Sequence, residues 1–242
     1  MFAGRAAGFV QCTGMIGVDF SQLRREEPLA VLVSGGVDSA VLVALAVRQT
    51  ISLHPLYVRC GLHWEEVELF YLRRFLAALN AHQVQPLVVL DLPVRDLYGE
   101  HWSVNGRQVP DADSPDEAVY LPGRNVLLLS KALLWCHLHR VPVLALGTLR
   151  SNPFADATPE FLSRMAEVVN QACGDRLRVV QPLRHLDKAQ VVALGRELPL
   201  GWTFSCVAPQ GQLHCGRCNK CAERRRAFAA SNLPDPTVYA HA

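Results

Sequence analysis

The sequence predicts an α/β fold: a Rossmann-like open parallel sheet of about five strands with helices on both faces, followed by a small cysteine-rich subdomain at the C-terminus. Short apolar runs rich in β-branched residues alternate with longer helical patterns, which is typical of β–α–β units. The first run ends in a Ser-Gly-Gly turn at residues 34–36. Half of the eight cysteines lie between residues 206 and 221.

The first half of the chain supplies three strands and two helices. Residues 29–33 (LAVLV) form a short β-branched run, as expected for a buried parallel strand. Residues 37–47 are mostly apolar, so this helix should pack on the sheet. A second strand is expected over residues 54–58 and a third over residues 86–92. Between them, residues 64–79 predict an amphipathic helix, with an apolar face formed by Val67, Phe70, Tyr71, Phe75 and Leu79.

The second half continues the alternation. Thr158, followed by Pro159, and Asp187 are residues typical of helix N-termini. Three helices are expected: one over residues 121–139, one that begins at residue 158, and one over residues 187–198. The expected strands cover residues 142–147 and 178–181. The last forty residues hold the cysteine cluster and a basic helix.

Length and composition restrict the class of protein. Of the 242 residues, 50% are hydrophobic and 19% are charged, as in a globular domain with a buried core. The net charge of +2 predicts neither stable nucleic-acid binding nor attraction to an anionic membrane. No apolar run reaches the roughly 20 residues of a membrane span, and residues 1–21 lack the apolar core of a secretory signal. We therefore expect a cytoplasmic protein.

The polar stretch over residues 98–119 interrupts the alternation. It contains two prolines, two glycines and an acidic cluster, and predicts a long surface loop or lid with solvated carboxylates. The expected organisation is an N-terminal extension over residues 1–28, a nucleotide-binding α/β domain over residues 29–200, and a metal-binding segment with a helix over residues 201–242.

The segment between the first strand and the first helix has the character of an anion site. It consists of Ser34, Gly35, Gly36, Val37, Asp38 and Ser39. Glycines allow the backbone to approach an anion closely, and the free N–H groups of a helix N-terminus bind phosphate oxygens. Asp38 would repel phosphate, so it is expected to bind Mg²⁺ or backbone N–H groups. The segment is neither a Walker A loop nor a dinucleotide fingerprint.

The cysteine spacing predicts a metal site. Four thiolates from Cys206, Cys215, Cys218 and Cys221 suit a tetrahedral Zn²⁺ ion with no open position, hence a structural site. An iron–sulfur cluster is the alternative, because C-x2-C-x2-C also begins a ferredoxin-type run. The other cysteines, Cys12, Cys60, Cys136 and Cys173, are scattered and predict small buried hydrophobic residues.

Two motifs resemble known families. The SGGVDS segment is similar to the SGGxDS loop of the PP-loop ATP pyrophosphatases, which implies an adenine nucleotide alpha hydrolase-like fold. The C-terminal sequence SCVAPQGQLHCGRCNKCAERRRAF resembles that of the 7-cyano-7-deazaguanine synthases. Residues 122–125 (PGRN), 154–161 (FADATPEF) and 182–188 resemble further segments of the same family. The resemblance extends over residues 29–229, with departures at residues 58–63 and 148–158.

The resemblance implies an ATP-dependent ligase of queuosine biosynthesis. Such an enzyme converts 7-carboxy-7-deazaguanine, ATP and ammonia into the nitrile, through an adenylated carboxylate and an amide. It implies ATP, Mg²⁺ and Zn²⁺ as cofactors, and a homodimer as the assembly. The departures leave open another small-molecule carboxylate as the substrate.

The same resemblance assigns roles to individual residues. The phosphates would contact the SGGVDS loop, with Asp38, Arg124 and Lys188 as catalytic groups. Substrate binding is expected at His63, Asn125, Phe154 and Asp156.

Two other classes of function share the loop. A tRNA-modifying thiolase or lysidine-type ligase would need RNA-binding surface, and the Arg224–Arg226 run is expected to be a solvated helix face instead. A non-catalytic nucleotide-binding module is the second alternative, against which the complete SGGVDS segment argues.

Overall fold

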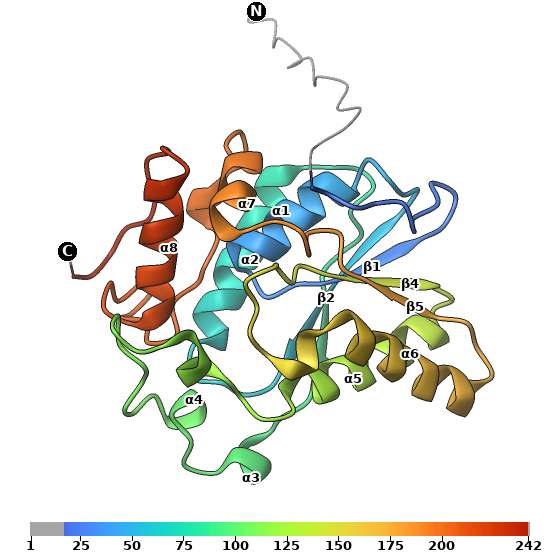
Figure 1. The fold of residues 1–242 in the computed structure, drawn as a ribbon, viewed down its shortest axis with the longest axis horizontal. Helices are drawn as coiled ribbons and strands as arrows, with labels where there is room; N and C mark the ends of the chain where they lie inside the picture. The colour runs from blue at the N-terminus through green and yellow to red at the C-terminus, as the bar shows by residue number, and fades with distance from the viewer. Residues whose placement is uncertain (1–16, 242) are drawn as a thin grey trace, which may run out of the picture.

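The centre of the molecule is a five-stranded parallel sheet in the order β3-β2-β1-β4-β5 (Figure 1). The computed structural model describes residues 17–241. The strands are β1 Leu29–Leu32, β2 Leu53–Arg59, β3 Val88–Asp91, β4 Val143–Leu146 and β5 Arg178–Val180. Leu29 of β1 is in register with Leu53 of β2 and with Val143 of β4. The predicted fold class, strand number and parallel pairing are confirmed.

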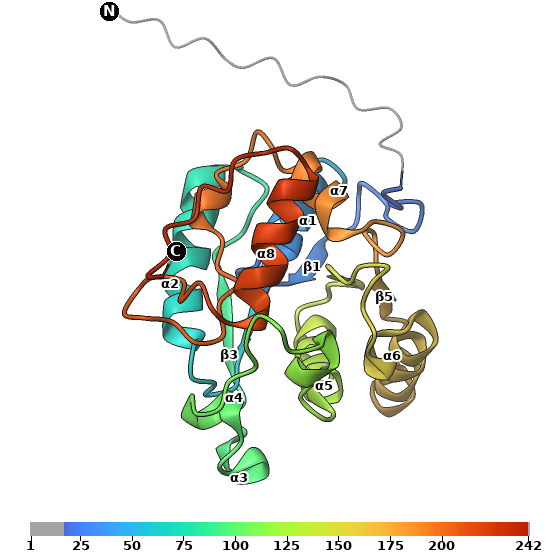
Figure 2. The same ribbon diagram turned by 60° about the vertical axis from the view of Figure 1, so that its left-hand side comes forward.

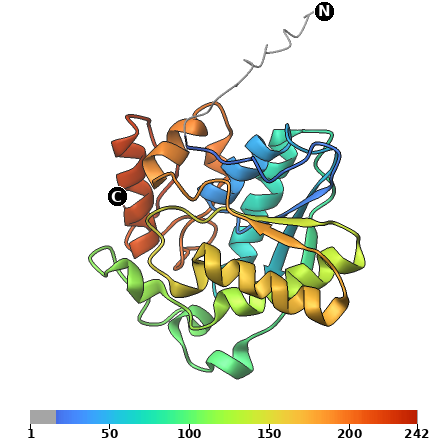
Figure 3. The same cartoon turned by 45° about the vertical axis from the view of Figure 1, so that its right-hand side comes forward.

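Helices cover both faces of the sheet (Figures 1 and 3). One face carries α1 Val37–Ala46, α2 Glu65–Leu79 and α7 Lys188–Leu194, and the other carries α5 Arg124–Leu138 and α6 Pro159–Cys173. Successive residues of β1 enter opposite cores, as the two-residue period of a strand requires. Leu29 and Val31 lie in the core with Val41 of α1 and Val191 of α7, whereas Ala30 lies in the core with Leu133 of α5.

The strand order reverses between β1 and β4, which places a crevice at their carboxyl ends. β1 leads into α1 there, and β4 leads into the segment before α6. A parallel open sheet binds its ligands at such a reversal, because the helix N-termini on both sides point toward it. The SGGVDS segment lies at this position, between β1 and α1.

Residues 98–119 have more regular structure than the long surface loop that the sequence predicts. It contains the end of α3 Arg95–Tyr98, α4 Trp102–Asn105 and the 3₁₀ helix η1 Asp116–Val119. Its later part is fixed to the start of the last helix, α8 Asn219–Ala230: the Asn219 side chain donates to Ser114 O at 2.8 Å, and the Asn219 N–H donates to Pro110 O at 3.0 Å. The predicted acidic side chains are exposed, as expected.

Two helices differ from their predictions in detail. The buried residues of α2 are Glu65, Glu68, Leu69, Leu72 and Phe75. Of the predicted apolar face, Phe75 is buried but Val67, Tyr71 and Leu79 are only partly buried, because two glutamates take inward positions at the N-terminal end. The helix predicted over residues 187–198 ends at Leu194. A Cβ on Gly195 would lie 2.8 Å from Val41 Cγ2, so the chain turns where it passes closest to α1.

The C-terminal segment packs directly on the α/β domain (Figure 2). After the 3₁₀ helix η3 Leu200–Trp202, the chain passes the SGGVDS segment at residues 34–39, which we call the phosphate loop after its predicted role. There the Phe204 N–H donates to Gly35 O at 2.8 Å. Ala227 and Phe228 of α8 belong to the same core as α1 and α7.

The expectation of a solvated arginine run was wrong for Arg224. It is 1% exposed and donates to Thr203 Oγ1 at 2.8 Å, Leu200 O at 3.1 Å and Asp235 Oδ1 at 3.3 Å. Arg226 of the same run is exposed. One arginine of the run is therefore a buried anchor of α8, a role that depends on residues outside the helix.

The N-terminal extension is described from Gly17 onward, and the prediction for Cys12 lies outside the described residues. The described part is held by hydrogen bonds from Asp19 N–H to Pro182 O at 2.8 Å and from Arg178 to Gln22 O at 2.6 Å. Within residues 17–241, none of the helices combines the length and the apolar character that crossing a membrane requires.

Candidate active site

The phosphate loop is held open by glycine. Gly35 has a φ of +74°, in the left-handed region, and a Cβ there would lie 3.0 Å from Glu68 Cγ and 3.1 Å from Glu68 O. Gly36 precedes the first residue of α1 and has no side chain to cover the helix N-terminus. The chain therefore presents backbone N–H groups at the positive end of α1, which suits an anion.

Two serine hydroxyls fix the shape of the loop. Ser39 Oγ donates to Gly36 O at 3.1 Å and accepts from the Ser34 N–H at 3.3 Å. The Ser34 and Ser39 hydroxyls lie 3.4 Å apart. On the far side lies Gly147, the residue directly after β4. A Cβ on Gly147 would lie only 3.2 Å from Ser39 N. The loop is thus enclosed by backbone on the side of β4.

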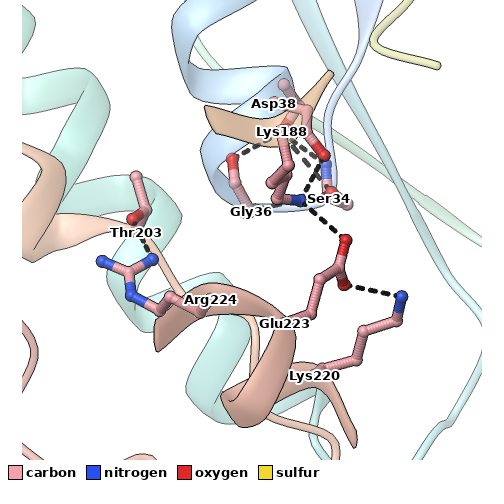
Figure 4. A network of polar contacts seen from close by, with 9 residues as sticks. Ser34, Gly36, Asp38, Lys188, Thr203, Lys220, Glu223 and Arg224 are labelled. Carbon is pink, nitrogen blue, oxygen red and sulfur yellow. Dashed lines mark hydrogen bonds and ion pairs between the residues drawn. The ribbon is translucent and has the colours of Figure 1, made fainter. Parts of the chain in front are cut away.

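Asp38 begins a chain of charged groups, which we call the lysine cluster: Asp38, Lys188, Glu223 and Lys220 (Figure 4). Lys188 Nζ lies 2.6 Å from Asp38 Oδ2 and 3.6 Å from Glu223 Oε1. Lys220 Nζ lies 2.8 Å from Glu223 Oε2. Three elements supply these residues: α1, α7 and α8.

The start of α7 is fixed by its own sequence, which positions Lys188. Asp187 Oδ1 accepts from the Gln190 N–H at 2.9 Å, and Gln190 Oε1 accepts from the Asp187 N–H at 2.9 Å. This capping box makes Lys188 the first helical residue. The residue predicted as a phosphate or carboxylate ligand is thereby brought against Asp38.

Burial and pairing act in opposite directions within the lysine cluster. Burial raises the pKa of Asp38, and Lys188 opposes that shift. Burial also opposes the charge of Glu223, but Lys188 and Lys220 lower its pKa to about 2. The pKa of Lys188 is raised by Asp38 and Glu223 in spite of its burial. Asp38 Oδ1 is buried and has no hydrogen-bond partner among residues 17–241.

A second group of ionisable residues, which we call the Glu68 cluster, consists of Tyr57, Glu68 and Arg124. The Tyr57 hydroxyl donates to Glu68 Oε2 at 2.6 Å. Burial raises the pKa of Glu68 to about 8, against the opposing effects of the Tyr57 hydrogen bond and of the Arg124 charge. Arg124 is the first residue of α5, and its Nε is buried without a partner in the described chain.

The two clusters meet at one cavity of about 270 Å³. From the phosphate loop and the lysine cluster its lining includes Ser34, Gly36, Asp38, Lys188, Lys220 and Glu223. From the other elements it includes Trp64, Glu68, Arg124 and Phe154. The predicted loop and both predicted cations therefore share one cavity, which can hold an anionic ligand beside buried carboxylates.

The predicted substrate residues differ in their position relative to the cavity: Phe154 is among its lining residues, whereas His63, Asn125 and Asp156 are not. Phe154 lines the cavity and lies against Tyr120, with ring centroids 5.1 Å apart. Asn125 and Asp156 are bound to each other: the Asn125 N–H donates to Asp156 Oδ2 at 3.2 Å, and its side-chain amide donates to Asp156 Oδ1 at 3.3 Å. This pair caps the start of α5. His63 is exposed, and its ring lies about 2.7 Å from where a Cβ on Gly106 would be.

Sequence reasoning missed Glu68, Lys220 and Glu223 as cavity residues. A glutamate on the apolar side of an amphipathic helix was an available indication for Glu68, because a carboxylate at a buried position has a specific partner. Lys220 and Glu223 lie among the cysteines and arginines of α8, where the sequence gives no direction for their side chains.

The four predicted cysteines converge. Their Sγ atoms all lie within 4.8 Å of one another, and all four residues are buried. The Sγ atoms of Cys215 and Cys221 lie 3.9 Å apart, as do those of Cys206 and Cys218. Four sulfurs at about 2.3 Å from a tetrahedral zinc would be separated by about 3.8 Å, so the group has the dimensions of a metal site.

Backbone N–H groups prepare these sulfurs for negative charge. Cys206 Sγ accepts from the Ala208 and Cys215 N–H groups at 3.3 and 3.2 Å. Cys215 Sγ accepts from the Arg217 and Cys218 N–H groups, both at 3.3 Å. Cys218 also precedes the first residue of α8, so the cysteine group lies at the start of the helix that carries Lys220 and Glu223.

The remaining cysteines differ in character. Burial raises the pKa of Cys60 to about 11 and that of Cys136 to about 12. Both side chains are buried in apolar clusters, as predicted. Cys173 is half-buried. Because an activated cysteine nucleophile has a lowered pKa, the raised pKa values of Cys60 and Cys136 indicate that these two residues serve in packing.

Comparison with known proteins decides the family. The model of the family described as "Queuosine biosynthesis protein QueC" matches residues 29–232. The chain belongs to the QueC family. The resemblance expected from the sequence is therefore confirmed, and the match extends across the segments where this chain departs from the expected motifs.

Several curated relatives of this QueC family member carry the name 7-cyano-7-deazaguanine synthase. The relative from Xanthomonas campestris pv. campestris is 35% identical over 225 residues, which cover 87% of this chain and 96% of the relative. The relative from Stenotrophomonas maltophilia is 32% identical, with 87% and 98% covered. The relative from Solidesulfovibrio magneticus is 32% identical, with 86% and 94% covered.

Among solved structures, the U34-tRNA thiolase NcsA from Methanococcus maripaludis superposes with a TM-score of 0.47 at 13% identity. The superposition covers 90% of this chain and 77% of that chain. At this level of similarity it says nothing about the function of the QueC family member.

Proposed function

We propose that this protein is an ATP-dependent 7-cyano-7-deazaguanine synthase, which joins ammonia to 7-carboxy-7-deazaguanine and dehydrates the amide to the nitrile. The observation that carries the proposal is the open phosphate loop at the N-terminus of α1, which faces one cavity together with Arg124 and the lysine cluster. The relatives' name supports the substrate.

ATP is the activating group in this proposal. Its phosphates would bind the loop formed by Ser34, Gly35, Gly36, Val37, Asp38 and Ser39, where N–H groups and hydroxyls are available. Lys188 and Arg124 would offset the negative charge that develops on the departing pyrophosphate.

Magnesium fits the loop through Asp38. Its Oδ1 is a buried carboxylate oxygen without a partner in the described chain, and carboxylate oxygens are preferred Mg²⁺ ligands. Lys188 already binds Oδ2, so the side chain is held with Oδ1 free for a cation. Bound Mg²⁺ would neutralise phosphate charge.

Zinc fits the four cysteines, and we propose that it is structural. Cys206, Cys215, Cys218 and Cys221 would fill all four positions of a tetrahedral ion. The ion would thereby join the turn at Cys206 to the start of α8.

The acceptor would bind where aromatic and polar side chains border the cavity. Trp64 and Phe154 offer faces for a planar ring system. Asp156 and Asn125 would recognise the polar edge of the ring, which requires that their mutual hydrogen bonds open toward the ligand. His63 would approach the same edge only from the exposed start of α2.

Three further features belong to the proposal: ammonia as the nitrogen source, a cytoplasmic location, and a homodimer without stable nucleic-acid binding. The modest net charge of +2 is consistent with the last of these.

The test is a direct assay. Purified protein is incubated with ATP, Mg²⁺, ammonium and 7-carboxy-7-deazaguanine, and the products are identified by mass spectrometry. We expect the nitrile with AMP and pyrophosphate, and with Asp38→Asn a loss on the order of 10²-fold, the size of effect seen when one preorganised electrostatic contact to the transition state is removed. Asp113→Asn, on an exposed residue, is the matched control. A protein that releases no pyrophosphate with this carboxylate would contradict the proposal.

A further inference from the structure

Glu68 has one oxygen bound and one oxygen open to the cavity. Its Oε2 accepts from the Tyr57 hydroxyl at 2.6 Å. Its Oε1 has no hydrogen-bond partner among residues 17–241, and the residue lines the cavity. The side chain passes directly over the phosphate loop, because its Cγ would lie 3.0 Å from a Cβ on Gly35.

Glu65, one helical turn earlier, has no such freedom. Its carboxylate accepts from the N–H groups of Cys60, Gly61 and Leu62 at 2.8, 2.6 and 3.0 Å. These bonds hold the turn between β2 and α2, which is a structural role. The two buried glutamates of one helix therefore differ, because Glu68 lines the cavity with one carboxylate oxygen unbound, whereas Glu65 is held by three backbone N–H groups.

The surroundings of Glu68 favour reversible protonation. Tyr57 faces it from β2, Glu65 from α2 and Arg124 from α5. Burial raises the pKa of Glu68, Glu65 raises it further, and Tyr57 and Arg124 lower it, with a result of about 8. A carboxylate with such a value can accept a proton near neutral pH and release it again.

The proposed reaction needs such a group, and this inference rests on the proposed function. In amide formation, nitrogen bonds to the carbonyl carbon, the carbon–oxygen bond to AMP breaks with its electron pair, and nitrogen loses one proton. In nitrile formation, the amide oxygen displaces pyrophosphate from a second ATP, AMP then leaves with the carbon–oxygen electron pair, and nitrogen loses two protons. Each proton must pass to a base.

We propose that Glu68 is the general base of both steps, with Oε1 accepting the protons that the substrate nitrogen loses and returning them to solvent. Adenylation of the carboxylate releases no proton from nitrogen, so it does not require Glu68. The two parts of the reaction are therefore separable in one variant.

The experiment compares Glu68→Gln with Glu66→Gln, the same change on the exposed side of the same helix. Carboxylate-dependent exchange of labelled pyrophosphate into ATP is measured first, and conversion of 7-amido-7-deazaguanine to the nitrile second. We expect Glu68→Gln to retain the exchange and to lose nitrile formation by about 10²- to 10⁴-fold. Glu66→Gln should retain both. Nitrile formation by Glu68→Gln at the wild-type rate would overturn the proposal.

Tyr57→Phe gives an independent test that leaves the carboxylate in place. Nitrile formation by the wild type should rise with pH around the pKa of Glu68, which is about 8. Loss of the Tyr57 hydrogen bond removes a contact that stabilises the ionised form, so the rise should move to higher pH. An unmoved rise would count against Glu68. If the wild type shows no pyrophosphate exchange, the proposed function fails as well, whereas exchange with an unaffected Glu68→Gln refutes this inference alone.

Discussion

The lysine cluster and the Glu68 cluster border the same cavity but differ in how completely their charges are paired. In the lysine cluster each charged group has an oppositely charged partner, from Asp38 through Lys188 and Glu223 to Lys220. In the Glu68 cluster the carboxylate has only a phenol as its hydrogen-bond partner, and Arg124 Nε has none within the described chain.

The difference shows that a fully paired group of buried charges is suited to hold a side chain in place, whereas a buried carboxylate with an unbound oxygen is suited to exchange protons with a ligand. Paired buried charges stabilise a fixed geometry, and loss of one partner leaves the other uncompensated. Burial raises the pKa of a carboxylate that has no ion-pair partner, so that it can hold a proton near neutral pH and exchange it. The lysine cluster is thus suited to holding Asp38 at the phosphate loop, and the Glu68 cluster to proton transfer.

The largest effect is expected when the lysine cluster loses its support. Cys218→Ser removes one ligand of the proposed zinc site at the residue before α8, so Lys220 and Glu223 should lose their fixed positions. Structural zinc in small peptides contributes on the order of 10 kcal/mol, so the variant should lose bound metal, thermal stability and most activity. Metal content by mass spectrometry and thermal melting measure the change.

Cys173→Ser is the matched control, because this cysteine is half-buried and lies outside the metal group. It should keep metal content and melting temperature close to wild type. A Cys218→Ser protein that melts normally without metal would show that α8 does not depend on the site.

A smaller effect is expected from the arginine that anchors α8. Arg224→Met removes the hydrogen bond to Thr203 (Figure 4). It also removes the hydrogen bond to Leu200 O and leaves Asp235 without its cation. Breaking such a buried pair costs about 3–5 kcal/mol of unfolding free energy, measured by urea denaturation. Arg226→Met, on the exposed side, should change it by less than about 0.5 kcal/mol. Equal effects of the two substitutions would contradict the buried role.

The smallest effects should separate the two clusters by pH. The pKa of Glu223 is lowered from 4.5 to about 2, so its contribution to stability is present above pH 4.5 and is lost as pH falls toward 2. The pKa of Glu68 is raised from 4.5 to about 8, so its contribution is present below pH 4.5 and is lost as pH rises through 8. Unfolding free energies across this range measure both.

Substitution by glutamine assigns each slope to its residue. Glu223→Gln should flatten the acid side of the stability profile, and Glu68→Gln the alkaline side. The comparison between the clusters would fail if both variants flattened the same side.

The sequence alone predicted most of the local conformation. Strand positions follow from short β-branched runs, the turn at residues 34–36 follows from two glycines between a strand and a helix, and the convergence of the four cysteines follows from their spacing. The start of α7 follows from Asp187 and Gln190, which form a capping box within four residues. Each of these features depends on residues that are close in the chain, so their order carries the information.

The tertiary structure decided which distant side chains meet. Lys188 reaches Asp38 across 150 positions of the chain, because α7 and α1 pack on the same face of the sheet. Arg224 is buried because Thr203 and Asp235 surround it, although the sequence of its helix predicts a basic, solvated face. Glu68 faces the cavity because glycine at position 35 lets α2 approach the loop. Periodicity and spacing encode local conformation, whereas contacts between elements depend on how the whole core packs.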